Sequence, residues 1–84
     1  MKRILVVDDE PAIVSLLATV LRDKGWEVTG AGSGTEGIES LERGRFDVIL
    51  TDLVMPGESG IDLLRAAKEI QPEVEVILMT GYAT

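Results

Sequence analysis

The sequence predicts an α/β fold, a doubly wound parallel sheet with helices on both faces. Short apolar runs alternate with segments of helical spacing, and the connections between them are short enough for β-α-β units. Three of the four apolar runs are continuous, as expected for strands that are covered on both faces. A chain of 84 residues with 45% apolar and 27% charged residues is long enough for one small globular domain.

The four expected strands differ in their patterns. The runs over 4–7, 48–50 and 76–79 are continuous and aliphatic, and the last, within the segment 74–79, is the expected fourth strand. Residues 26–29 alternate between apolar and polar side chains, which is typical of an edge strand with one face in water. The second strand should therefore lie outside the first, which gives the strand order 2-1-3-4.

Three segments between the strands have helical spacing. The first begins near Pro11 and ends at Gly25, the second begins at Ser33 with a capping-box spacing to Glu36, and the third begins near Gly60. The second ends at Gly44 and the third at Pro72. The apolar stripes consist of Ile13, Leu16, Leu17, Val20 and Leu21 in the first helix, Ile38 and Leu41 in the second, and Ile61, Leu64, Ala67 and Ile70 in the third.

Composition excludes several classes of function. Eight basic against 15 acidic residues give a net charge of −7, which disfavours direct contact with nucleic acid or an anionic membrane. The chain has no cysteine and no histidine, which excludes disulfides, thiolate or imidazole metal sites and a Ser-His-Asp triad. The apolar run at 4–7 is too short for a signal peptide or a membrane span, so a cytoplasmic protein is expected.

Oxygen-bearing side chains follow three of the expected strands. Asp8 and Asp9 follow the first, Asp52 ends the third, and Thr80 ends the fourth. Ligands of open parallel sheets bind beyond the carboxyl ends of the strands, near the point where the strand order reverses. Carboxylates about 4 Å apart repel by roughly 1 kcal/mol in water and about 4 kcal/mol at an effective dielectric constant of 20. Such a cluster requires a cation or a proton, and hard oxygen ligands favour Mg²⁺. Each acid taken singly could instead cap a helix or begin a turn.

Three stretches, Ile4–Pro11, Asp47–Gly57 and Val76–Gly81, resemble the receiver domain of two-component response regulators. The resemblance implies a flavodoxin-like receiver fold in which Asp52 takes a phosphoryl group from a sensor histidine kinase, with Mg²⁺ as cofactor. It implies Asp9 and Asp52 as Mg²⁺ ligands, and the Val54 backbone carbonyl as a further ligand. Asp8, the other member of the acidic pair, is implied as a catalytic residue and indirect ligand, and Thr80 as the switch hydroxyl. Such a domain is a phosphoacceptor that promotes its own phosphorylation and dephosphorylation, not a turnover enzyme.

The stretches Met55–Asp62 and Met79–Ala83 are most similar to those of receivers joined to enhancer-binding transcription activators, which implies a C-terminal output domain. A complete receiver continues with a fourth helix, a fifth strand and a fifth helix. Residues 1–84 are therefore expected to be its four-strand N-terminal portion, incomplete at the C-terminus. The family's lysine after the fifth strand would then lie beyond Thr84, which puts phosphorylation of this piece in doubt. An open fourth strand also predicts self-association or swapping.

Other functions stay open on the sequence alone. Gly32, Gly34 and Gly37 form a G-x-G-x-x-G pattern that follows a strand and opens a helix, with Asp52 twenty residues after Gly32, as in a dinucleotide-binding unit. A fingerprint of that kind normally follows a central strand, however, and this one follows an edge strand. A receiver-like interaction module without phosphorylation is a second alternative. A Mg²⁺-dependent phosphohydrolase would need a second acid at position 54, which is valine.

Overall fold

The computed structural model describes residues 2–79, which form one parallel sheet and three helices. The elements in chain order are β1 (Arg3–Val7), α1 (Pro11–Asp23), β2 (Glu27–Ala31), α2 (Gly34–Arg43), β3 (Val48–Asp52), α3 (Gly60–Ile70) and β4 (Glu75–Met79). The sheet has the order β2-β1-β3-β4, as the sequence predicts. Val7 of β1 lies opposite Ala31 of β2 and Thr51 of β3, so the carboxyl ends of these strands meet at one edge.

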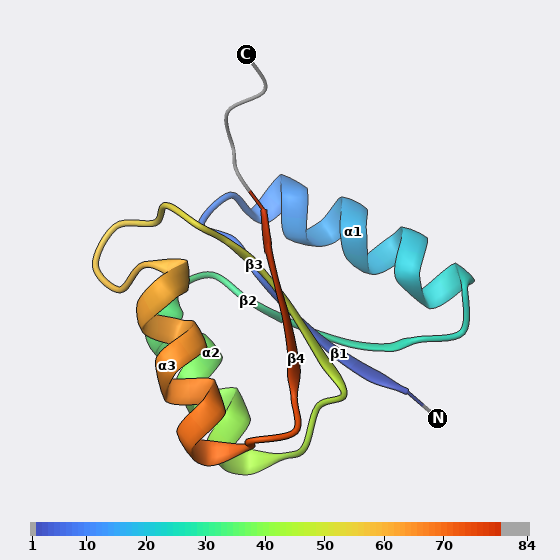
Figure 1. Ribbon diagram of the computed structural model, residues 1–84. Helices are drawn as coiled ribbons and strands as arrows, with labels where there is room; N and C mark the ends of the chain where they lie inside the picture. The colour runs from blue at the N-terminus through green and yellow to red at the C-terminus, as the bar shows by residue number, and fades with distance from the viewer. Residues whose placement is uncertain (1, 80–84) are drawn as a thin grey trace.

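The sheet is covered on both faces, by α1 on one side and by α2 and α3 on the other (Figure 1). Because side chains alternate along a strand, β1 contributes to two cores. Ile4 and Val6 pack with Ala18 of α1, whereas Leu5 and Val7 pack with Leu63 of α3 and its neighbours. This confirms the doubly wound arrangement. None of the helices in residues 2–79 is long and apolar enough to cross a membrane.

The prediction of the buried face of α1 is partly wrong. The residues that pack towards the sheet are Val14, Leu17, Ala18 and Leu21. Three of the expected stripe residues are exposed instead: Ile13 by 36%, Leu16 by 63% and Val20 by 48%. Apolar residues occupy almost every side of this helix, so its rotation could not be read from spacing alone. The expected ends are confirmed, because the helix begins at Pro11 and Gly25 follows it with a left-handed φ of 93°.

The buried face of α3 is also rotated from the prediction, whereas that of α2 is as expected. Leu41 is buried in α2 and Ile38 packs against the same core. In α3 the buried residues are Gly60, Leu63 and Ala67, while Ile61 and Ile70 are exposed. A Cβ at Gly60 would lie 2.5 Å from the Asp52 carbonyl oxygen, so only glycine allows this helix to begin against β3. Leu63 and Ala67 follow at i+3 and i+7 on the same side, which fixes the buried face.

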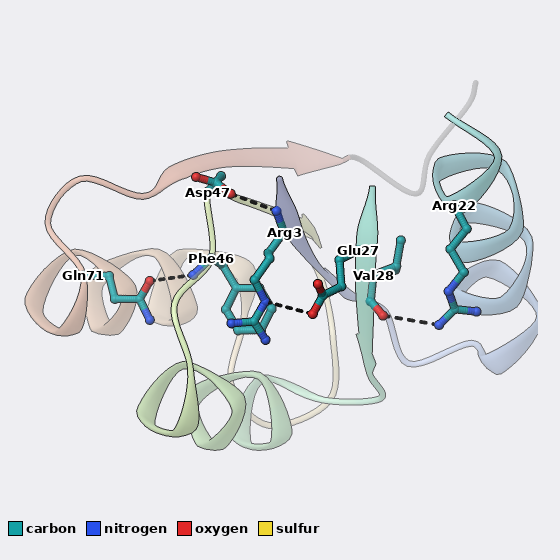
Figure 2. Close-up of polar contacts among 7 residues, drawn as sticks. All are labelled: Arg3, Arg22, Glu27, Val28, Phe46, Asp47 and Gln71. Atoms are coloured by element: carbon teal, nitrogen blue, oxygen red, sulfur yellow. Dashed lines mark hydrogen bonds and ion pairs between the residues drawn. The ribbon is translucent and has the colours of Figure 1, made fainter. Parts of the chain in front are cut away.

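Polar contacts link the loops at the amino ends of the strands, opposite the carboxyl ends where Asp8, Asp9 and Asp52 lie. Figure 2 shows the Arg3 amide donating to Asp47 Oδ2 at 2.8 Å and the Arg3 Nε beside Glu27 Oε1 at 3.2 Å. The Arg3 guanidinium also lies 5.0 Å from the centre of the Phe46 ring. Gln71, just after α3, accepts from the Phe46 amide at 2.9 Å (Figure 2) and donates to the carbonyls of Leu41 and Gly44. Gln71 thus joins the loops after α2 and α3.

Candidate metal centre

Three carboxylates converge at the carboxyl edge of the sheet. Asp8, Asp9 and Asp52 each bring one carboxylate oxygen within 4.8 Å of the other two. The parallel pairing of Val7 with Thr51 accounts for this, because Asp8 and Asp52 are the next residues along two neighbouring strands. Thr80, the expected hydroxyl of the same edge, lies outside the described residues.

Asp8 is the buried member of the cluster, with 6% of its surface exposed. Its amide donates to the Ala31 carbonyl at 3.1 Å, and its Oδ1 accepts from the Glu10 amide at 2.9 Å. Burial raises the pKa of the Asp8 carboxyl above its ordinary value, and the charges of Asp52 and Asp9 raise it further, against the opposing hydrogen bond from Glu10. Burial and the two neighbouring carboxylates thus disfavour the ionised form of this carboxyl, which a nearby cation would stabilise.

Asp52 ends β3, and two backbone hydrogen bonds fix the residue that follows it. The Leu53 amide donates to the Met79 carbonyl at 2.8 Å, and the Gly60 amide donates to the Leu53 carbonyl at 3.0 Å. The Val54 amide turns back and donates to Asp52 Oδ1 at 3.3 Å, while the Val54 side chain is 64% exposed. The carboxylate is therefore oriented by its own loop, and Asp9 completes the cluster from the exposed side.

The donor chemistry of the cluster fits a hard divalent cation. All the side-chain donors are carboxylate oxygens, the ligand type that Mg²⁺ prefers. Within residues 2–79 the only ion pair joins Arg3 to Glu27, near the opposite edge of the sheet. No lysine or arginine of the described part of the chain thus pairs with the three acids, and their mutual repulsion is left for a cation to relieve.

The glycine pattern of the dinucleotide alternative has a packing role instead. The Gly32 amide donates to the Glu36 carboxylate at 3.0 Å, and Gly37 lies against Val7 and Leu63. Gly34 is in close contact with Glu58, from the loop that precedes α3. Carboxylate side chains thus lie where a pyrophosphate would need free amides, which argues against the dinucleotide interpretation. No sequence pattern indicates the role of Glu58, because its partner Gly34 is 24 positions away in the chain.

The family model for the response regulator receiver domain matches residues 4–84. The chain belongs to the response regulator receiver domain family. This receiver domain is 39% identical over 83 residues to the response regulator receiver protein CpdR of Brucella abortus, which covers 99% of this chain and 69% of CpdR. It is also 39% identical over 78 residues to the probable transcriptional regulatory protein TcrX of Mycobacterium tuberculosis, covering 93% of this chain. The match spans only 33% of TcrX, about a third of that relative's length.

Solved structures agree with the family and with the fold. The receiver domain superposes on the response regulator TrrA of Thermotoga maritima, in complex with Mg²⁺-BeF, with a TM-score of 0.91 and 38% identity. That match covers 99% of this chain and 72% of the TrrA chain. A second structure contains TrrA with the histidine kinase ThkA, and there the TM-score is 0.89 over 100% of this chain and 72% of that chain. The flavodoxin-like receiver fold expected from the sequence is confirmed.

Proposed function

We propose that this receiver domain accepts a phosphoryl group from a sensor histidine kinase on Asp52, with Mg²⁺ bound by Asp8, Asp9, Asp52 and the Val54 backbone carbonyl. The observation that carries the proposal is the convergence of three carboxylates at one edge of the sheet. The relative TrrA gives further support, because it is bound to Mg²⁺-BeF in one structure and to a histidine kinase in another.

The geometry suits attack by a carboxylate on phosphorus. An Asp52 oxygen attacks the phosphorus of the kinase's phosphohistidine, the bond from phosphorus to the imidazole nitrogen breaks, and imidazole leaves. The Val54 amide, which donates to Asp52 Oδ1, keeps the carboxylate oriented for this attack. When bound, Mg²⁺ neutralises the repulsion between the anionic nucleophile and the phosphoryl oxygens. Water later attacks the aspartyl phosphate, which releases phosphate and restores the Asp52 carboxylate.

We extend the proposal to Thr80, which lies outside the described residues, and to the partners of the domain. Thr80 is the hydroxyl that responds to the phosphoryl group, and a sensor histidine kinase is the donor. Residues 1–84 are the four-strand N-terminal portion of a receiver domain, which agrees with their coverage of 72% of the TrrA chain. The transcriptional relative TcrX supports a C-terminal output domain that regulates transcription. The protein acts as a phosphoacceptor that promotes its own phosphorylation and dephosphorylation. A cytoplasmic location stays a prediction.

Mass spectrometry after incubation with acetyl phosphate and Mg²⁺ tests the proposal. We expect one added phosphoryl group on the wild type, if not on residues 1–84 alone then within a full-length protein that carries the C-terminal lysine. We expect none without Mg²⁺ and none on Asp52→Asn. The variant Asp47→Asn is a matched control, because Asp47 lies at the opposite end of β3, and it should be modified like the wild type. Modification of the wild type only within a full-length protein would locate the defect in the missing C-terminal segment. Equal modification of Asp52→Asn would contradict the assignment, as would a wild type that gains no phosphoryl group either as residues 1–84 or within a full-length protein. The latter outcome would favour an interaction module without phosphorylation.

We also propose that the chain associates with a second copy through β4. In residues 2–79 this strand pairs only with β3, and the Ile77 side chain is 53% exposed. Sedimentation at high concentration should show a mass above that of the monomer, and Ile77→Lys should lower it because a charge on an edge strand opposes pairing. Leu16→Lys, on the exposed side of α1, should leave the association unchanged. A monomeric wild type with cooperative unfolding would contradict this proposal.

A further inference from the structure

The loop 53–59, between β3 and α3, rests on the first turn of α2. A Cβ at Gly34 would lie 2.8 Å from the Glu58 Cβ and 3.0 Å from the Glu58 carbonyl oxygen, closer than a real side chain allows. The neighbouring Thr35 hydroxyl donates to Glu58 Oε1 at 3.3 Å. Glu58 is thus fixed by a steric contact and by a hydrogen bond, both from the start of α2.

Glycine is required at position 34 by space and not by backbone conformation. Among the glycines of the described residues, positive φ angles occur at Gly25 and Gly57 but not at Gly34. Gly34 is the first residue of α2, where alanine would favour the helix more than glycine does. The lack of a side chain therefore serves the contact with Glu58.

A short path connects this contact to the acidic cluster. Glu58 precedes Gly60 by two residues, and a Cβ at Gly60 would lie 2.5 Å from the Asp52 carbonyl oxygen and 3.0 Å from the Leu53 Cα. The Gly60 amide also donates to the Leu53 carbonyl. Glu58 is therefore two residues from a glycine that packs directly against the backbone of Asp52, whose carboxylate lies in the cluster.

We propose that Gly34 and Thr35 are positioning residues for the Asp52 carboxylate, acting through Glu58 and Gly60. This inference rests on the proposed Mg²⁺ site and adds to it a contact from outside the cluster. It also gives the glycine pattern of the β2–α2 connection a function, because Gly34 provides the surface on which the loop 53–59 rests. Because coupling is reciprocal, a change at Asp52 should also alter the conformation of the first turn of α2.

Titration with Mg²⁺ by calorimetry, combined with backbone amide NMR of the Mg²⁺-free chain, tests the proposal. Gly34→Ala should weaken Mg²⁺ binding about tenfold, the low end of the effect of residues that support metal ligands. Gly32→Ala is the matched control, because its Cβ would lie 3.7 Å from Glu36 Oε1, an ordinary contact, and it should bind as the wild type does. Thr35→Val should weaken binding about twofold, and Thr35→Ser should restore it.

The amide readout separates this proposal from the proposed function. In Gly34→Ala, and not in Gly32→Ala, the amide signals of Leu53 and Gly60 should shift without any metal. Unchanged amide signals in a folded Gly34→Ala, or unchanged Mg²⁺ affinity where the wild type binds, would overturn the positioning role. A wild type that binds no Mg²⁺, or that binds equally well as Asp52→Asn, would instead contradict the metal site. Should Gly34→Ala fail to fold, the Thr35→Val and Thr35→Ser pair decides the question by the same two readouts.

Discussion

Replacing Gly60 by alanine is expected to destabilise the protein by about 3 kcal/mol, at the upper end of the usual cost of overpacking. The added Cβ would meet backbone atoms, the Asp52 carbonyl oxygen at 2.5 Å and the Leu53 Cα at 3.0 Å, and backbone cannot move aside as a flexible side chain can. Because Gly60 begins a helix, alanine would otherwise be favoured there, so the loss reports the contact itself. Urea unfolding of the wild type and the variant measures the effect.

The same substitution should weaken Mg²⁺ binding, since the displaced atoms are those of Asp52 and its neighbour. Gly32→Ala is the matched control, because it also adds a methyl group at the carboxyl edge of the sheet but meets nothing closer than 3.7 Å. It should leave both the free energy of unfolding and the Mg²⁺ affinity unchanged. A Gly60→Ala protein as stable as the wild type would show that α3 can begin further from β3 than the structure has it.

Replacing Asp8 by asparagine is expected to have opposite effects on stability and on Mg²⁺ affinity. Without metal, the variant should be more stable than the wild type by about 1 kcal/mol, because a buried charge close to two others is removed. The asparagine oxygen can still accept from the Glu10 amide, so the start of α1 is preserved. With Mg²⁺ bound, the wild type should be the more stable of the two proteins, since the loss of one carboxylate should lower the Mg²⁺ affinity of the variant at least tenfold.

The pH dependence of stability gives the Asp8 prediction a second readout. Burial raises the pKa of the Asp8 carboxyl in the folded chain. At pH values between the ordinary pKa and the raised pKa, the folded state therefore binds more protons than the unfolded state. The Mg²⁺-free wild type should therefore lose stability as the pH rises through that interval, and Asp8→Asn should lack this loss. Urea unfolding at a series of pH values checks it. A wild type and variant with parallel pH profiles would contradict the role given to Asp8.

The strand order and the acidic cluster could be predicted because both depend on simple rules. The alternation of residues 26–29 placed β2 at an edge, and parallel strands bring their carboxyl ends to one side, which put Asp8 and Asp52 together. The burial of Leu63 in place of Leu64 could not be predicted, because the rotation of α3 is set by the approach of Gly60 to β3.

Long-range contacts of polar side chains with the backbone also escaped sequence reasoning. Gln71 donates to the Leu41 carbonyl 30 positions away, and Glu58 packs against Gly34, yet neither pair has a periodic or motif signal. The glycine pattern was visible, but the sequence could not show that a carboxylate side chain from another loop occupies its surroundings. Motif spacing predicts which residues reach the site, whereas the contacts that hold them depend on the assembled fold.

We infer that Asp8, Asp9 and Asp52 share one divalent cation. A crystal structure of the chain grown with Mn²⁺, which also takes carboxylate and water ligands, tests it most directly through the anomalous signal of the metal. We expect a single peak bounded by the three carboxylates, which is lost in Asp52→Asn. Carboxylates that point to separate regions of the protein would contradict this inference. A metal peak elsewhere in the protein, without one between the three carboxylates, would also contradict it.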